Sequence, residues 1–465
     1  MSIKDLRSDP QKFRDNQKNR FSDPNIVDNV LKLDALWLKE DLMVNKLNQF
    51  KNIITKHIVQ VKNNPANNLL CEEEKESFDK IFECVLAGKI SDVENILNKF
   101  PENESVLLSK YTSTKIAEIN NSATKKNRDT EIHKLGNVLH KDVPIYADEN
   151  NNTIVYEKNP TNLDKLKYNH VDLCNKLDFI DTARGANLAG NRGYFLKGLA
   201  VKLNMALMMY ALDFLEKKGY QQMYVPHLMN SNVMEKLCQL QDFDDTLYKV
   251  QVNSSVGEHQ ENNSTKYLIA TSEQPLTGYY MNYKFKADEL PIRFCGISTC
   301  YRKETGSHGK DTLGIFRVHQ FEKIEQLCIT EENESEKMFH EMIGNSKEFY
   351  DSLGLSYRVI SIVSGALNNA AAIKYDLEGY FAGSGTYREL VSCSNCTDYF
   401  SRRLNIKDKH GKHVHILNST LCANTRTLCC ILEQYQTDKG VNIPEVLKPY
   451  MHNMESLFIP FKNFN

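Results

Sequence analysis

The sequence predicts an α+β protein, in which a large antiparallel β-sheet flanked by helices follows an N-terminal antiparallel helical hairpin. Apolar residues recur with helical spacing in the first part of the chain, whereas helical stretches and short strands mix from about residue 170 onward. The strands are spaced too irregularly for successive βαβ units. The chain has no P-loop and no dinucleotide-binding glycine fingerprint.

The composition by itself names no partner. The chain has 465 residues, with 58 basic and 60 acidic side chains and 12 cysteines. This length allows two or three domains, and the balanced charge means that a nucleic-acid ligand would need a local basic surface. No long apolar run and no secretory signal is evident. We therefore expect a cytoplasmic protein with reduced thiols and no membrane association.

Two helical stretches in the first part of the chain favour a hairpin. The first has an apolar stripe with steps of three, four and seven: Leu36, Met43, Leu47, Phe50, Ile54, Ile58 and Val61. The second, at 111–139, has a sparser stripe. Between them, residues 71–104 carry ten acidic and four basic side chains, within an insert at about 64–108. Two long helices joined by an acidic insert predict an antiparallel pair.

Both helical stretches are basic. Residues 32–62 and residues 109–134 each carry six basic and three acidic side chains. Two interpretations are open at this point. The hairpin is a dimerisation or spacer element whose charges keep it soluble, or it lies along a polyanion, because lysines near phosphates release counterions.

The second part of the chain follows a polar segment. We expect an N-terminal domain at 1–145, a linker or surface strand pair at 146–169, and a second domain at 170–465. Residues 194–219 fit an amphipathic helix closed by glycine, and the next residues fit a strand that ends at Pro226.

The stretch CYRKETGSHGKDTLGIFRVHQFEK, residues 300–323, reads as a hairpin that gathers charged and aromatic groups. Alternation places Arg302 and Glu304 on one face of the first strand. In the return strand it separates Arg317, His319, Phe321, Lys323 and Glu325 from a mostly apolar face of Phe316, Val318, Gln320 and Ile324. Arginines fit phosphate oxygens and a ring can stack under a base, so a flat phosphorylated ligand is one interpretation. An exposed hairpin with cross-strand ion pairs is the other.

Three further segments support the ligand interpretation. TSEQPLTGYY, residues 271–280, places Thr271 and Glu273 on one face of a strand. Glu389 and Ser392 would face opposite sides of a regular strand, so a bulge or bend must bring them together. Arg426 falls in the first turn of a helix, where amides and guanidinium favour an anion.

In this order the segments resemble the motifs of class II aminoacyl-tRNA synthetases, specifically the seryl-tRNA synthetase family of eukaryotic cytosolic type. Residues of about 198–226 resemble motif 1, which forms the dimer interface in this family. YRKE and FRVHQFEKIEQ resemble motif 2 (about 294–326), and LNSTLCANTR resembles motif 3 (about 415–436). TSE and RELVSCSNCTDY resemble the serine family's own segments, and the hairpin ending in LGNVLHKDVP resembles its tRNA-binding arm. Phe400 departs from the pattern, since glutamine is more usual there.

The resemblance implies a two-step reaction. L-serine and ATP would give seryl-adenylate, and the seryl group would pass to the 3′ terminal adenosine of tRNA(Ser), with tRNA(Sec) a further expected acceptor. A homodimer is implied, with Mg²⁺ accompanying ATP and no zinc. Arg302 would bridge serine carboxylate and α-phosphate, Arg426 would bind the γ-phosphate end, Glu304 would contact the adenine amino group, and Phe321 would stack on the ring.

The resemblance also implies the full set of site residues. Serine would contact Thr271, Glu273, Arg302, Glu325, Asn418 and Thr420. ATP would contact Arg302, Lys303, Glu304, Arg317, Val318, His319, Gln320, Phe321, Glu389, Leu390, Val391, Ser392 and Arg426. Mg²⁺, which prefers hard oxygen ligands, would be held by Glu389 and Ser392. The arm would contact RNA, read by shape and backbone, through Lys51, Lys56, Lys125, Lys126 and Arg128.

Two alternatives come from other classes. A related ligase that activates another amino acid or loads a carrier protein would be expected to lack the long arm. A catalytically inactive paralogue acting as an RNA-binding module would be expected to lose at least one of Arg302, Glu304, Glu325, Glu389 and Arg426. A zinc site at Cys393 and Cys396 would need further ligands, and we expect buried thiols instead.

Overall fold

The structure is a computed structural model, and its contacts divide the chain into two compact units. The described residues are 2–60, 72–87, 102–158, 166–238, 246–251, 265–304, 313–451 and 458–462. The helical unit comprises Ile3–Arg14 and Pro24–Leu135, and the sheet unit comprises Met1–Ser2, Asp15–Asp23 and Gly136–Asn465. Among the described helices, none has both the length and the apolar character needed to cross a membrane.

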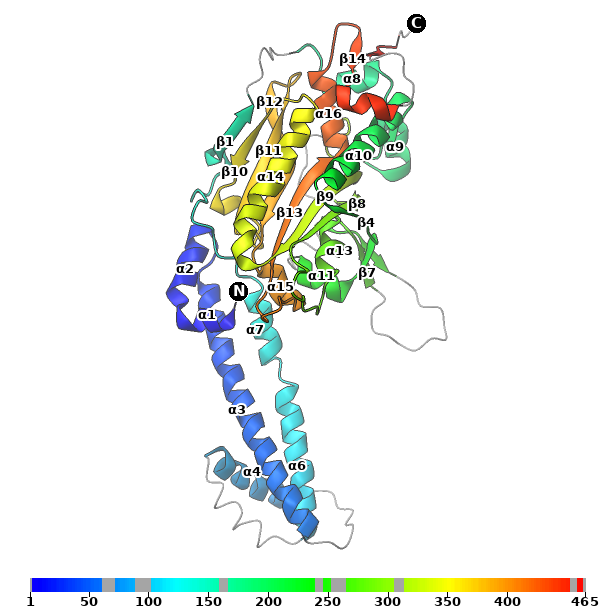
Figure 1. Ribbon diagram of the computed structural model, residues 1–465. Helices are drawn as coiled ribbons and strands as arrows, with labels where there is room; N and C mark the ends of the chain where they lie inside the picture. The colour runs from blue at the N-terminus through cyan, green and yellow to red at the C-terminus, as the bar shows by residue number, and fades with distance from the viewer. Residues whose placement is uncertain are drawn as a thin grey trace. The chain divides into compact units, whose positions relative to one another are not determined.

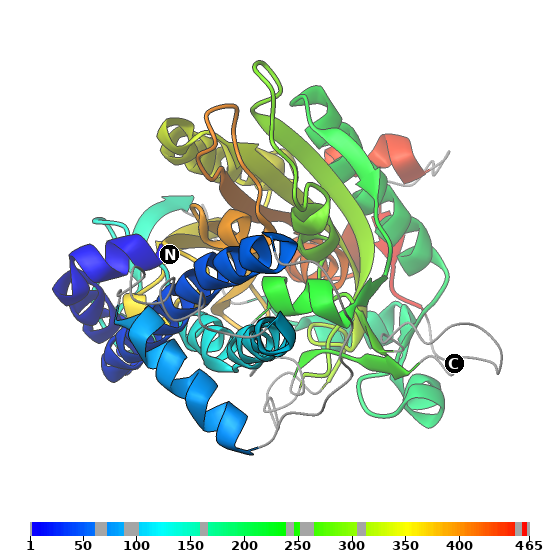
Figure 2. The same cartoon turned by 90° about the horizontal axis from the view of Figure 1, so that it is seen from below.

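The helical unit is built on an antiparallel pair. The helices of the N-terminal region are α1 (Ile3–Ser8), α2 (Pro10–Asn19), α3 (Asn25–Gln60), α4 (Glu72–Leu86), α6 (Glu102–Asn120) and α7 (Thr124–Ile132). Helix α3 packs against α6 and α7, side by side in Figures 1 and 2. Asp34 contacts Arg128, whereas Glu40, further along α3, contacts Ser122. The pairing therefore runs in opposite directions, and the predicted antiparallel hairpin is confirmed.

The apolar stripe of α3 is only partly buried. Leu47, Phe50 and Ile54 lie in a core shared with α4 and α6, as the periodicity predicts. Leu36 and Met43 are exposed, so the prediction is wrong for the first half of the stripe. Val61 and much of the acidic insert lie outside the described residues. The second helical stretch is two helices rather than one, because the chain turns between α6 and α7.

The sheet unit contains an eight-stranded sheet in the order β1-β10-β11-β12-β13-β9-β8-β4 (Figure 1). Every neighbouring pair is antiparallel except β4 with β8. The predicted antiparallel sheet is confirmed, with one parallel pair at its edge. Its strands are β1 (Thr153–Lys158), β4 (Gln221–Tyr224), β8 (Ile292–Tyr301), β9 (Gln320–Thr330), β10 (Tyr357–Ser361), β11 (Ile373–Phe381), β12 (Thr386–Asn395) and β13 (His415–Ala423).

Two expectations about the sheet unit change in detail. The segment expected to be a linker or a surface strand pair supplies β1, an edge strand of the main sheet. The helix expected from residue 194 begins at Leu199, because Phe195–Leu196 pairs with Ile180–Asp181 as a short ribbon of β3 and β2. The helix ends before Gly219, whose positive φ suits glycine, as predicted.

Helices cover both faces of the sheet. One face packs against α10, α14 and α16, which also contact one another, and the other packs against α11, α13 and α15. The helices of the sheet unit are α8 (His170–Lys176), α9 (Thr182–Ala189), α10 (Leu199–Lys217), α11 (Ser231–Leu237), α13 (Glu273–Gly278), α14 (Ser335–Ser352), α15 (Tyr399–Leu404) and α16 (Asn424–Gln434). Short strands form two further sheets: β5 (Leu228–Asn230), β6 (Lys249–Gln251) and β7 (Thr265–Leu268), and β14 (Gly440–Asn442) with β15 (Phe458–Pro460).

Candidate active site

One face of the sheet carries most of the predicted site residues. Glu325 on β9 is paired with Thr420 on β13 and with Gly296 on β8. Because side chains alternate along a strand, Phe321 and Lys323 share the face of Glu325. The sheet thus brings together residues that lie far apart in the sequence.

A pocket on this face gathers the residues predicted to bind serine. Thr271, Glu273 and Arg302 line it. Behind them, the amide nitrogen Nδ2 of Asn418 donates to Oε1 of Glu273 at 3.0 Å. The Thr420 hydroxyl donates to Oε2 of the buried Glu325 at 3.2 Å. The six predicted residues therefore form one neighbourhood.

The segment that carries Glu273 is a helix, and its predicted strand is wrong. Thr271 lies in the loop after β7, and Glu273 opens α13. Pro275 falls in the first turn, where the helix does not need its missing N–H. Gly296 lets this turn lie close against the sheet, because a Cβ there would stand 2.6 Å from a methyl of Leu276.

The pocket raises the pKa of Glu273 to about 7. Desolvation is the main cause, and the negative charge of Glu325 adds to it. The positive charges of Lys323 and Arg302 oppose this rise.

Lys323 is part of this neighbourhood, although the sequence analysis gave it no role in binding. Its ammonium nitrogen Nζ lies 2.5 Å from Oε2 of Glu325 and 3.5 Å from the Thr420 hydroxyl. The sequence did place Lys323 on the same strand face as Phe321 and Glu325, and this position could have indicated a role in the pocket. The pairing with Thr420 could not be foreseen, since β13 lies far along the chain.

A second pocket gathers residues predicted to bind ATP. Its lining is Arg302, Glu304, Phe316, Arg317, Val318, Phe321, Ala423, Thr425 and Arg426. The guanidinium of Arg302 lies 5.2 Å from the ring centre of Phe321. Arg426 is in the first turn of α16, as predicted, and lies 5.0 Å from the ring centre of Phe316. Two arginines thus face aromatic rings in one pocket.

The strand alternation expected around this pocket holds only in part. Strand β8 ends at Tyr301, and Glu304 has a φ of 53°, so its position does not come from alternation. Glu304 instead pairs with Arg317 at 2.9 Å. Strand β9 begins only at Gln320, and Phe316, expected on an apolar face, lines the pocket.

The other predicted ATP residues are placed differently. His319 Nδ1 lies 2.9 Å from the backbone oxygen of Arg302 and so links the two sides of the hairpin. Leu390 and Val391 bury their side chains in the core, which leaves only their backbone for a ligand. Lys303 is half-buried and Gln320 is exposed, and neither lines the described pocket.

A β-bulge brings Glu389 and Ser392 to the same face, as the sequence analysis required. Glu378 on β11 pairs with Glu389, and its neighbour Leu377 pairs with Val391, so Leu390 is the extra residue. Desolvation acts to raise the pKa of Glu389, but the positive charges of Arg426, Lys374 and Arg302 outweigh it and the pKa lies below its ordinary value. Arg426 lies 3.5 Å from the Glu389 carboxylate.

Oxygen atoms suited to a divalent cation gather beside this bulge. Asp376 pairs with Ser392 across β11 and β12 and is buried. No donor among the described residues reaches its Oδ1, while Lys374 lies 3.5 Å from Oδ2. Burial raises the pKa of Asp376 to about 7. A buried oxygen without a partner, beside a carboxylate and a hydroxyl, fits a Mg²⁺ site.

The cysteines considered as zinc ligands are buried, as predicted. Cys393 and Cys396 are inaccessible, as are Cys422, Cys429 and Cys430. Burial raises the pKa of the Cys393 and Cys396 thiols. Buried, protonated thiols of this kind are inert.

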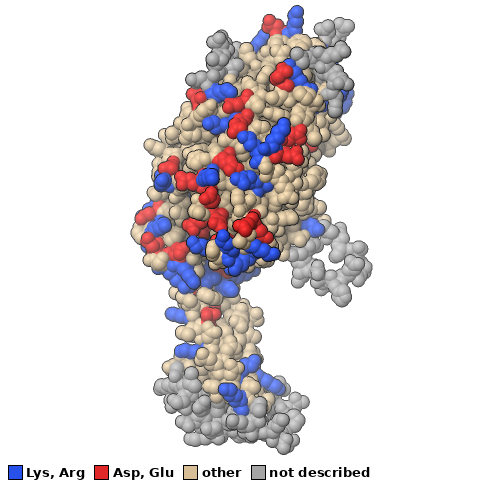
Figure 3. All heavy atoms as spheres, viewed as in Figure 1, with Lys and Arg blue, Asp and Glu red and all other residues tan. Residues whose placement is uncertain are grey.

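The helical unit presents four of the five predicted basic residues to solvent at least in part: Lys51, Lys56, Lys125 and Lys126. Arg128 differs, because it is buried, pairs with Asp34 at 3.2 Å and lies 4.4 Å from the ring of Trp37. It therefore holds α7 to α3 and is not available to RNA. Figure 3 shows basic side chains spread along the described part of this unit.

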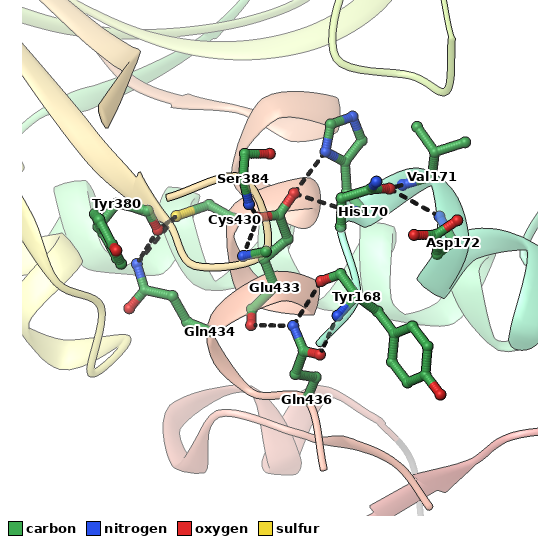
Figure 4. Close-up of polar contacts among 12 residues, drawn as sticks. Tyr168, His170, Val171, Asp172, Tyr380, Ser384, Cys430, Glu433, Gln434 and Gln436 are labelled. Carbon is green, nitrogen blue, oxygen red and sulfur yellow. Dashed lines mark hydrogen bonds and ion pairs between the residues drawn. The ribbon is translucent and has the colours of Figure 1, made fainter. Parts of the chain in front are cut away.

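A buried carboxylate connects α16 to two other segments of the sheet unit. Glu433 Oε1 accepts from the backbone N–H of His170 at 2.8 Å and lies 2.7 Å from His170 Nδ1. Oε2 accepts from the backbone N–H groups of Gly383 and Ser384. Figure 4 shows Glu433 between the start of α8 and this turn. Since Arg426 lies on the same helix, the network supports one side of the pocket that Arg302, Phe321 and Arg426 line.

Comparison with known proteins identifies the family of the chain. Residues 248–435 match the tRNA synthetase class II core domain (G, H, P, S and T), and residues 1–100 match the seryl-tRNA synthetase N-terminal domain. The chain is 44% identical to a serine–tRNA ligase of Helianthus annuus, over 95% of this chain and 94% of the relative. Human cytoplasmic serine–tRNA ligase is 42% identical, over 98% and 90%.

Solved structures give the same result. Cytoplasmic serine–tRNA ligase of Naegleria fowleri in complex with AMP has a TM-score of 0.80 and 44% identity, covering 98% of this chain and 96% of that one. Seryl-tRNA synthetase of Pyrococcus horikoshii complexed with ATP has a TM-score of 0.80 and 32% identity, covering both chains fully.

The fold and the two pockets define a class II aminoacyl-tRNA synthetase. The similarity extends over nearly the whole chain, including the N-terminal helices. The chain belongs to the seryl-tRNA synthetase family.

Proposed function

We propose that this protein acts in the cytoplasm as a serine–tRNA ligase, which forms seryl-adenylate from L-serine and ATP and transfers the seryl group to the 3′ terminal adenosine of tRNA(Ser), with tRNA(Sec) a second acceptor. One observation carries the proposal. Arg302 lines both the pocket of Thr271 and Glu273 and the pocket of Phe321 and Arg426. A cation shared by the two pockets is where two anionic reactants must meet.

The first step needs alignment and neutralisation of charge rather than a protein nucleophile. An oxygen of the serine carboxylate attacks the α-phosphorus of ATP, and pyrophosphate leaves. Arg302 would bridge these groups, and Arg426 would bind the γ-phosphate end. Arg317 would assist these arginines at the phosphates. Its buried Nε has no hydrogen-bond partner among the described residues, so this nitrogen is available to a phosphate oxygen. Phe321 would stack on adenine, and Glu304 would accept from its amino group.

Selectivity for serine would come from buried polar groups. The buried carboxylate of Glu325, which is paired with Thr420, would accept a hydrogen bond from the serine hydroxyl that an alanine side chain cannot donate. A site built around a hydroxyl rejects the analogue without it by roughly 10⁴-fold. Threonine would be excluded by size.

Glu389 and Ser392 would hold Mg²⁺, with Asp376 close behind them. The ion would supply positive charge to the phosphates of ATP. The bulge at Leu390 would position the two ligands, because it turns both side chains to one face.

The helical unit would bind tRNA, and the sheet unit would form a homodimer. Lys51, Lys56, Lys125 and Lys126 offer charges to an RNA backbone, which is recognised mainly by shape. Dimerisation is supported by an exposed apolar stripe on α10, formed by Val201, Met205 and Met209, beside the edge strand β4 with its exposed Tyr224.

The test is ATP–pyrophosphate exchange with serine, threonine, alanine, glycine and cysteine in turn. We expect exchange with serine alone, and its loss in E325A and E325Q. E341Q is a matched control, because Glu341 pairs with Arg293 outside both pockets. Exchange with another amino acid would overturn the substrate. No exchange from folded protein that binds serine tRNA would favour the inactive paralogue.

A further inference from the structure

We propose that Lys323 is a positioning residue of the amino-acid pocket, and that its fixed charge matches the two carboxylates there to a single substrate ammonium group. The inference rests on the proposed function, because it concerns how the same pocket selects its amino acid. Three features carry it: the contacts of Lys323, the count of charges around it, and the groups that face Glu273.

Lys323 contacts two of the residues predicted to bind serine. It is buried, and Nζ lies 2.5 Å from Oε2 of Glu325 and 3.5 Å from Oγ1 of Thr420. Thr420 in turn donates to the same Glu325 oxygen. A buried ammonium stays charged only where such partners compensate its desolvation. Lys323 thus acts through Glu325 and Thr420 rather than by contact with substrate.

Arg403 also lines the pocket, but its guanidinium donates to the Tyr399 hydroxyl and is not among the charges that act on Glu273. The charges that do act on Glu273 balance only if Lys323 is counted. An amino acid brings one ammonium and one carboxylate, and the proposed function assigns the carboxylate to Arg302. Glu273 and Glu325 then remain, with two negative charges. Lys323 reduces their sum to −1, which one ammonium neutralises. Without Lys323, two buried carboxylates would repel each other and one would take up a proton.

Lys323 also fixes the orientation of Glu325. Both the ammonium of Lys323 and the hydroxyl of Thr420 contact Oε2. With Oε2 held by both groups, the carboxylate has one orientation, and Oε1 takes no part in these two contacts. Under the proposed function, Oε1 is the oxygen that contacts serine. A single oriented oxygen discriminates a hydroxyl from a methyl group better than a freely rotating carboxylate does.

The charged groups around Glu273 determine how the pocket responds to pH. Glu325 and Lys323 face it from β9, Arg302 follows β8, and Cys396 follows β12. Burial and Glu325 raise the pKa of Glu273 to about 7, while Lys323 and Arg302 lower it. An ammonium binds the ionised carboxylate, so serine should bind better as pH rises through about 7. Removal of Lys323 removes a lowering influence, and this transition must move to higher pH.

The experiment measures kcat/KM for serine in ATP–pyrophosphate exchange between pH 6 and 9. For K323M we expect the midpoint of the rise to move up by about one pH unit. Below the midpoint, this shift lowers kcat/KM for serine about tenfold. K323R should keep the original midpoint, and KM for ATP should not change. Q326M is the matched control, because Gln326 is buried on the same strand but bonds to Met342 and Ser346 behind the sheet.

The outcomes separate this inference from the proposed function. A higher KM in K323M with an unchanged midpoint would show that Lys323 only packs, and would overturn the inference. A midpoint that moves equally in K323R or Q326M would overturn it too. K323Q takes the place of K323M if that variant does not fold. If the unmodified protein shows no serine-dependent exchange, the proposed function itself fails.

Discussion

The Glu433 network makes a strong quantitative prediction. In E433Q the shape of the side chain is kept, but one carboxylate oxygen becomes an NH₂ group, which can only donate. If the NH₂ group faces Gly383 and Ser384, two backbone N–H groups lose their acceptor. If it faces His170, the backbone N–H of His170 loses its acceptor, and the ring Nδ1 does so too unless the ring proton moves to Nε2. One or two donors therefore lose their acceptor.

The magnitude follows from these contacts. Glu433 is fully buried, and a hydrogen bond to a charged group contributes about 1.5–3 kcal/mol. Loss of one or two such bonds destabilises the segment by about 1.5–6 kcal/mol. A local loss of about 3 kcal/mol corresponds to an opening equilibrium on the order of 100-fold larger. Since α16 carries Arg426, we also expect a higher KM for ATP.

Amide hydrogen exchange, read by mass spectrometry, tests this directly. Peptides that cover residues 168–172 and 380–386 should exchange at least tenfold faster in E433Q. E341Q, which alters a surface ion pair with Arg293, should leave both peptides unchanged. A change of less than about twofold in both peptides of E433Q would refute the reasoning, because the four contacts would then contribute little.

Three further predictions concern the arm and the cation site. R128M should destabilise the helical unit by about 2–4 kcal/mol in thermal denaturation, because Asp34 loses its buried partner and, among the described residues, keeps only Arg7. Serine-dependent exchange should stay normal, and an unchanged melting curve would contradict the structural role of Arg128. D376N should raise the Mg²⁺ concentration for half-maximal exchange several-fold, and an unaltered Mg²⁺ titration would remove Asp376 from the site. The double variant K125E/K126E should raise KM for tRNA at least tenfold with normal ATP–pyrophosphate exchange, whereas equal losses in both assays would indicate misfolding.

Much of the fold follows from periodicity, and its failures have local causes. The spacing of Leu47, Phe50 and Ile54 predicts a buried helical stripe, and α3 buries it. Leu36 continues the same stripe but is exposed, since periodicity says nothing about where a partner helix is present. Thr271 and Glu273 are expected on a strand, but Pro275 lies in the first turn of a helix, where proline is also common.

The site could be predicted where two residues had to share one ligand and therefore one face of the sheet. The need to bring Glu389 and Ser392 together predicts a bulge, and the structure has one at Leu390. Alternation fails at Glu304 and Phe316, because both lie outside the regular strands. Contacts between distant segments, such as that of Lys323 with Thr420, depend on strand order and have no local sequence signal.

The bulge at Leu390 makes the cation site depend on the number of residues as well as on their kind. Glu389 and Ser392 face the same side only because Leu390 is left out of the pairing with β11. If Leu390 were drawn into a regular ladder, one of the two oxygen-bearing side chains would turn to the opposite side of the sheet, although neither residue had changed. A shift of one residue in strand pairing is therefore a route by which a member of this family could lose its chemistry while every familiar motif residue is still encoded.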